Sequence, residues 1–79
     1  MTEYDHYNEA KTLISTLRDT PCADYADALQ AAIDGGSTGT EIFLALRWNL
    51  EHLIDEENLD PAIRRRAIQL RDELDSALQ

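Results

Sequence analysis

His52, Asp55 and Glu56 are the residues whose types and spacing come nearest to a metal-binding set. On a helix these three side chains lie within about one turn, where an imidazole and two carboxylates can ligate a divalent ion. In so acidic a chain, however, carboxylates fall next to histidines by chance, and His6 beside Asp5 is no stronger a candidate. We therefore expect a solvated helix face here, and no metal or other cofactor.

Residues 35–40, Gly-Gly-Ser-Thr-Gly-Thr, have the composition of a phosphate-binding loop. Such loops follow a strand and place glycines and a lysine at fixed spacings. Here no strand pattern precedes the segment, no lysine follows it, and the glycine spacing fits neither the P-loop nor the dinucleotide-binding motif. A connection between two helices explains the same residues, so nucleotide binding is not predicted.

A catalytic set of side chains is not expected either. No Ser/His/Asp or Cys/His combination can be placed from spacing, and 79 residues leave little volume for a pocket that excludes water. The single cysteine, Cys22, cannot form an internal disulfide or a cysteine-based zinc site. We expect Cys22 to be a small buried side chain and the protein to be a non-enzymatic one.

The cellular compartment is predicted from the cysteine content and the start of the chain. A lone cysteine fits a reducing compartment, and residues 1–5 are acidic and polar, unlike a secretory signal. No apolar run approaches the roughly 20 residues of a membrane helix. These features predict a cytoplasmic protein that does not enter a membrane.

The net charge of −9 comes from 16 acidic and seven basic residues. Such a surface repels nucleic-acid phosphates and anionic lipids, and it attracts basic protein surfaces. The partner predicted is therefore a protein with a basic surface, although a charge that serves solubility alone remains the alternative. Residues 64–66, three consecutive arginines, are the one basic run, and we expect them to contact acids on neighbouring helices.

Four helices are predicted by apolar residues that recur three and four positions apart. They are expected over about residues 3–18, 21–34, 39–54 and 61–77. Because the connections are short, neighbouring helices should be antiparallel. Residues 1–79 are thus predicted to form one all-α domain, a small antiparallel four-helix bundle.

The second helix has predicted signals at both ends. Thr20 is expected to cap it, with Pro21 at the first helical position, where the missing N–H does no harm. Gly35 and Gly36 are expected to end it in the left-handed conformation that glycine adopts at low cost.

The third and fourth helices also have predicted N-terminal caps. Thr38 and Glu41 match a capping box, and Asp60 followed by Pro61 repeats the order of a cap and then a proline. The apolar stripe expected to line the core from the fourth helix comprises Ile63, Ala67, Leu70, Leu74 and Leu78.

Apolar residues occur on two faces of the third helix. One face carries Ile42, Leu46, Leu50 and Leu53, while Leu44 and Trp48 fall on the opposite side with Glu51 and Asp55. Either the helix is central and covered on most sides, which is the interpretation we favour, or Leu44 and Trp48 form an exposed apolar spot ringed by acids. The second arrangement would be typical of a protein-binding hot spot.

The segment of about residues 35–54, which begins at the glycine-rich loop and includes Trp48, resembles a segment of small helical bacterial proteins of the immunity type. These are encoded beside secreted or contact-dependent toxins. The resemblance covers about a quarter of the chain and implies inhibition of a cognate toxin by tight binding. Many such toxins are basic nucleases, which agrees with the acidic surface of this chain. The family supplies no catalytic residues.

The partner-binding residues that we predict lie on the second and third helices. The acids flank aromatic side chains near the glycine-rich loop, in a part of the sequence with few bases. The predicted acids are Asp24, Asp27, Glu51 and Asp55, and the predicted anchor is Tyr25 or Trp48. A helical adaptor or homodimer, and an acidic mimic of nucleic acid, remain alternative functions.

Overall fold

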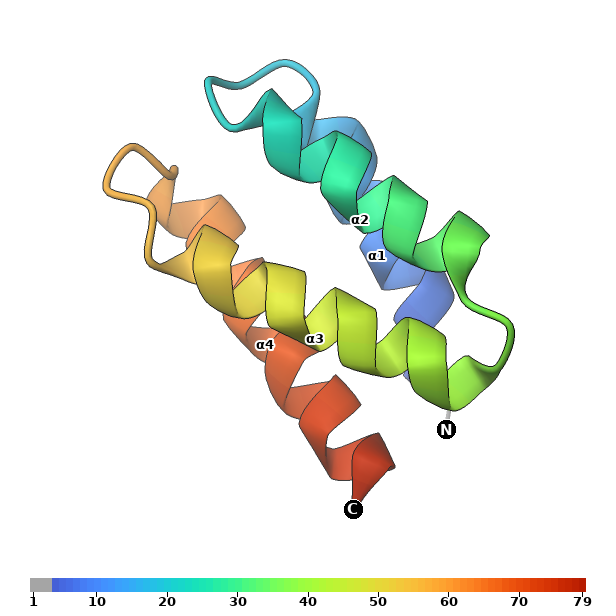
Figure 1. Cartoon of the computed structure of the whole chain (residues 1–79). Helices are drawn as coiled ribbons and strands as arrows, with labels where there is room; N and C mark the ends of the chain where they lie inside the picture. Colours follow the sequence, from blue (N-terminus) through green and yellow to red (C-terminus); the bar gives the residue numbers. More distant parts are fainter. Residues whose placement is uncertain (1–3) are drawn as a thin grey trace.

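The computed structural model describes residues 4–79, which form four helices joined by short connections (Figure 1). The all-α, antiparallel four-helix bundle is thereby confirmed, and no strand occurs within the described residues. The helices are α1 (His6–Leu17), α2 (Ala23–Gly35), α3 (Gly39–Ile54) and α4 (Pro61–Leu78).

The helices form a closed ring in which α1 contacts α2, α2 contacts α3, α3 contacts α4, and α4 returns to α1. The diagonal pairs of helices are too far apart for their backbones to touch. The molecule measures 30 × 29 × 19 Å, and the short dimension equals about two helix diameters. One layer of side chains therefore separates two layers of helices.

Leucine side chains fill that layer, with contributions from every helix. No polar or charged side chain is buried within residues 4–79. Leu70 and Leu74 are buried as predicted, as are Ile63 and Ala67, while Leu78 at the end of α4 is only partly covered. The largest fully buried side chains are Leu13, Leu17, Leu29, Leu46, Leu50, Leu53, Leu70 and Leu74.

Side-chain caps define the starts of α1, α3 and α4. Oδ1 of Asp5 accepts from the Asn8 N–H at 3.0 Å, and Oδ1 of Asp60 accepts from the Ala62 N–H at 2.8 Å. In α3, Oγ1 of Thr38 accepts from the Glu41 N–H at 3.2 Å, as the capping box predicts. The Glu41 carboxylate, however, accepts from the backbone N–H and the hydroxyl of Ser37, one residue earlier than expected.

The predicted start of the second helix was wrong by two residues. The Thr20 hydroxyl accepts from the Cys22 N–H at 3.1 Å and donates to the Leu17 carbonyl at 2.7 Å. These two hydrogen bonds stabilise turns in the connection after α1. Pro21 therefore lies in this connection, and α2 begins at Ala23. At the first helix, the predicted start at Glu3 falls outside the described residues; the helix begins at His6.

The predicted left-handed end of α2 was also wrong. Gly36 has φ −79° and ψ 137°, an extended conformation, and no glycine in the described part of the chain has a positive φ. Glycine is needed at this position for space. A Cβ atom on Gly36 would collide with the Ile42 side chain and lie 3.2 Å from the Ile42 backbone nitrogen. The loop can therefore pack closely against the first turn of α3.

The arginine run contributes to the bundle in two ways. Nη2 of Arg66 lies 3.5 Å from Oε2 of Glu9 on α1, as predicted for this run. Arg64 instead donates to backbone carbonyls, from Nε to Ile54 at 3.2 Å and from Nη2 to Glu56. A cation on the last carbonyls of a helix stabilises its C-terminus, so Arg64 fixes α4 to the end of α3.

Truncation of Leu70 tests the leucine core. Because the side chain is fully buried among leucines of other helices, we expect Leu70→Ala to lower the free energy of unfolding by about 2–5 kcal/mol. The matched control is Leu44→Ala, which removes the same atoms from an exposed position and should cost less than about 0.5–1 kcal/mol. Urea denaturation measures both, and equal losses would contradict the assignment of the core.

Candidate functional site

The outer face of α3 exposes two large apolar side chains. Trp48 is 62% exposed and Leu44 is 44% exposed, one helical turn apart. The favoured interpretation, in which Leu44 and Trp48 lie on a covered side of a central helix, was therefore wrong. Since α2 and α4 cover its two flanks and the core lies beneath it, the fourth side of α3 faces solvent. We call the exposed residues Leu44, Trp48, Glu51, His52 and Asp55 the Trp48 face.

The indole ring of Trp48 is held by its neighbour His52. The Nδ1 atom of His52 lies 2.8 Å from the Trp48 carbonyl, which can only accept, so Nδ1 is the donor. The two rings lie with their centroids 4.1 Å apart at an interplanar angle of 38°. This contact restrains the indole in the free protein, which lowers the side-chain entropy lost when a partner covers it.

The structure does not bring His52, Asp55 and Glu56 together as a cluster of ligands. Its Nδ1 atom is engaged with the helix backbone. Within residues 4–79, no three or more His, Cys, Asp and Glu side chains gather closely enough to hold a metal ion.

Two of the four predicted acids lie beside bases. Oδ1 of Asp27 is 3.2 Å from Nη1 of Arg18, at the end of α1. Oε1 of Glu51 is 3.8 Å from Nε of Arg47, whose Nη1 also lies 2.7 Å from Oδ1 of Asp75 on α4. The expectation that few bases lie near these acids therefore holds for Asp24 and Asp55 but not for Asp27 and Glu51.

The ion pairs show that the predicted acids lie in different surroundings. Asp27 leans toward α1, on the side of α2 away from α3, whereas Glu51 lies on the α4 side of the Trp48 face. Asp24 and Asp55 are exposed and make no ion pair within residues 4–79. Asp55 is the predicted acid that lies on the Trp48 face without a neutralising base.

Tyr25 is a less suitable anchor than Trp48. Its ring is partly buried against the core, and its hydroxyl donates to Oε1 of Glu56 at 3.0 Å. Burial raises the pKa of Tyr25, and the hydrogen bond to Glu56 raises it further. Tyr25 thus joins α2 to the segment after α3, and its polar group is already satisfied.

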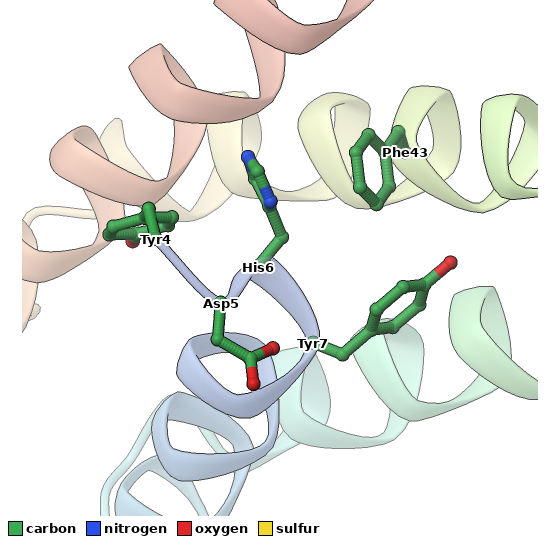
Figure 2. Close-up of a pocket in the computed structure, with 5 residues that line it drawn as sticks. All are labelled: Tyr4, Asp5, His6, Tyr7 and Phe43. Atoms are coloured by element: carbon green, nitrogen blue, oxygen red, sulfur yellow. The ribbon is translucent and has the colours of Figure 1, made fainter. Parts of the chain in front are cut away.

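A pocket of about 310 Å³ lies at the N-terminal end of α1, and sequence reasoning did not find it (Figure 2). Tyr4, Asp5, His6 and Tyr7 line it from one segment, and Phe43 completes it from α3. We call it the aromatic pocket. The ring centroids are 5.1 Å apart for Tyr4 and His6, 4.9 Å for His6 and Phe43, and 5.6 Å for Phe43 and Tyr7. The four rings therefore form a continuous row.

The row of rings is also fixed to α4. Nε2 of His6 lies 3.3 Å from the Glu73 carbonyl of α4, and because a carbonyl accepts, Nε2 donates. Burial of Tyr4, together with the nearby Glu9 and Glu73 carboxylates, raises the pKa of Tyr4 to about 12, and Arg66 opposes this. Tyr4 is therefore partly removed from water and lies close to two carboxylates.

No family model matches the sequence, and comparison with curated proteins and with solved structures found no match. Within residues 4–79, no helix combines the length and the apolar character needed to cross a bilayer.

The tyrosine environments predict a loss of stability at high pH. Below pH 10.0, the ordinary pKa, Tyr4 is neutral in both the folded and the unfolded protein. As the pH rises toward about 12, the unfolded protein ionises first, so the free energy of unfolding should fall. Tyr25 should contribute in the same direction. In Tyr4→Phe, the free energy of unfolding should fall less between pH 10 and about 12 than in the parent chain, as measured by urea denaturation at several pH values. The same dependence on pH in both proteins would contradict this assignment to Tyr4.

Proposed function

We propose that this chain is an acidic protein-binding module that binds a basic protein partner through the Trp48 face. More specifically, the chain is an immunity protein that neutralises a cognate bacterial toxin by direct binding. The observation that carries the proposal is the 62% exposure of Trp48 beside the exposed Leu44. The resemblance of about residues 35–54 to immunity-type proteins supports the proposal that the chain is an immunity protein.

An exposed tryptophan in a small acidic bundle is well suited to anchor a complex. Tryptophan is enriched at the centres of protein interfaces, where covering the ring removes a large apolar area from water. Here Leu44 extends the apolar surface by one turn, and His52 restrains the ring. Glu51 and Asp55 stand at the edge, where charges can remain solvated in a complex.

The charge distribution favours a basic partner over a second copy of this chain. Two copies would bring charges of −9 against each other, and Asp55 would approach its own equivalent or other acids. A basic surface would instead be drawn to the Trp48 face by the overall field and locally by Asp55. The proposal assigns no catalytic residue and no cofactor, and it places the protein in the reducing cytoplasm, in keeping with the free buried thiol of Cys22.

Co-expression with the product of the adjacent gene tests the proposal. A complex of one chain with a basic domain, formed with loss of that domain's toxicity, would support the immunity function. A homodimer of the isolated chain that buries Trp48 would instead favour the structural-module alternative. Displacement of DNA from a DNA-binding partner without any effect on toxicity would favour the nucleic-acid mimic.

Reversal of charge on the Trp48 face should slow association. In Glu51→Lys/Asp55→Lys, two acids next to Trp48 become bases, so we expect a lower association rate and a weaker dependence on salt. Stopped-flow fluorescence of Trp48 at several salt concentrations measures both quantities.

The matched control is Asp19→Lys/Asp72→Lys, which reverses two exposed acids outside the Trp48 face, one after α1 and one on α4. Each reversal adds two positive charges, so both double variants go from −9 to −5. If the control slows association as much as the test variant, the whole-molecule charge guides the encounter and the Trp48 face is not the binding surface.

Removal of the Trp48 ring should affect dissociation instead. Because the ring is exposed, we expect Trp48→Ala to leave the thermal melt nearly unchanged while it raises the dissociation rate by more than about tenfold. Surface plasmon resonance against the partner measures the rate. A variant that melts as the parent does and dissociates at the parent's rate would show that the indole is outside the interface.

A further inference from the structure

We propose that the aromatic pocket is a second binding site, one that takes an organic cation with an ammonium or guanidinium group. This inference rests on residues outside the Trp48 face and does not depend on the proposed function. The inference is based on the lining of one pocket, where four aromatic rings lie together with the exposed carboxylate of Asp5 (Figure 2).

The shape of the aromatic pocket suits a small cationic group. The ring row Tyr4–His6–Phe43–Tyr7 supplies a wall of aromatic surface, with neighbouring rings tilted or at right angles rather than stacked flat. Aromatic side chains attract a cation placed over a ring face within about 6 Å of its centre. The volume of about 310 Å³ is at the small end of ligand pockets, which are about 300–1,000 Å³, so it fits one basic side chain or a small quaternary ammonium ion.

The charges around the aromatic pocket favour a cation over an anion. Asp5 lines the pocket, and Glu9 and Glu73 are close enough to Tyr4 to act on its hydroxyl. Two positive charges oppose these carboxylates. Arg66 is paired with Glu9 at 3.5 Å, and the positive N-terminus of α1 is capped by Asp5 itself. Three carboxylates thus face one arginine and the partial positive charge of one helix end, so the local balance is negative.

The one N–H of the neutral His6 ring is engaged outside the aromatic pocket, because Nε2–H donates to the Glu73 carbonyl of α4. The ring therefore contributes surface between Tyr4 and Phe43.

The same chemistry can come from two sources. One is the lysine or arginine side chain of a basic protein, and the other is a free small molecule such as a quaternary amine. Both sources carry a positive charge on a group that is apolar at its surface or only weakly hydrated. Aromatic rings bind such groups through cation–π contacts. Titration with separate probes distinguishes them.

The experiment is an NMR titration of the intact chain with choline, with N-acetyl-arginine amide and with N-acetyl-lysine amide. We expect saturable shifts of the Tyr7 and Phe43 ring resonances with at least one of these. Tightest binding by choline would indicate a free small cation, and tightest binding by a capped amino acid would indicate a protein side chain. The decisive probe is the neutral isostere of choline, in which tert-butyl replaces trimethylammonium.

The isostere should bind at least about fivefold more weakly than choline, because it has the same shape without the charge. Equal binding of the two would overturn the proposal and show an apolar pocket for neutral molecules. The absence of saturable shifts with any cation would overturn it as well.

Two pairs of variants separate a local site from the general attraction of an acidic protein. Asp5→Asn removes a pocket charge while asparagine still caps α1, and Asp72→Asn removes one charge elsewhere. Only the first should weaken choline binding, by about threefold or more. Phe43→Leu should weaken it likewise, and Trp48→Leu, on the outer face of α3, should not. If Asp72→Asn weakened choline binding as much as Asp5→Asn, and Trp48→Leu as much as Phe43→Leu, choline would bind nonspecifically and the proposal would be overturned.

Discussion

The packing of leucine side chains into one layer is the constraint on which the rest of this bundle depends. With no polar or charged side chain buried in the described residues, apolar burial must offset the conformational entropy of the whole chain. Each helix can give only one face to so thin a core. Charged residues must therefore occupy the outer faces, and the acidic excess accumulates there with few bases to neutralise it. The surface that is available for binding follows directly from the shape of the core.

The sequence was sufficient to predict the four helices because their signals are local. Thr38 and Asp60 cap within three residues of themselves, and the stripe through Leu70 and Leu74 needs only helical spacing. The start of α2 and the conformation of Gly36 depend on contacts between segments, namely the turn bonds of Thr20 and the approach of Ile42. Capping preferences could not reveal those contacts.

The functional surfaces were harder to predict, for a related reason. Apolar residues on both faces of α3 indicate burial only if something covers both faces, and a closed ring of four helices leaves the outer one uncovered. The ion pairs of Asp27 and Glu51 join residues on different helices. The aromatic pocket needs Phe43 beside Tyr7, although α1 and α3 are diagonal in the ring. The exposed side of α3, the ion pairs and the aromatic pocket all depend on how the helices pack against one another.

α3 contributes to both surfaces, through Trp48 to one and through Phe43 to the other, and its geometry decides whether they can act together. Phe43 and Trp48 are five positions apart, which at about 100° per residue turns their side chains about 140° away from each other. Phe43 points toward α1 and Trp48 toward solvent. A flat partner surface that covers Trp48 therefore cannot also fill the aromatic pocket, whereas a partner with a projecting basic loop can wrap around the N-terminal end of α3. Because Phe43 and Trp48 belong to one helix, the two sites keep a fixed distance and orientation relative to each other.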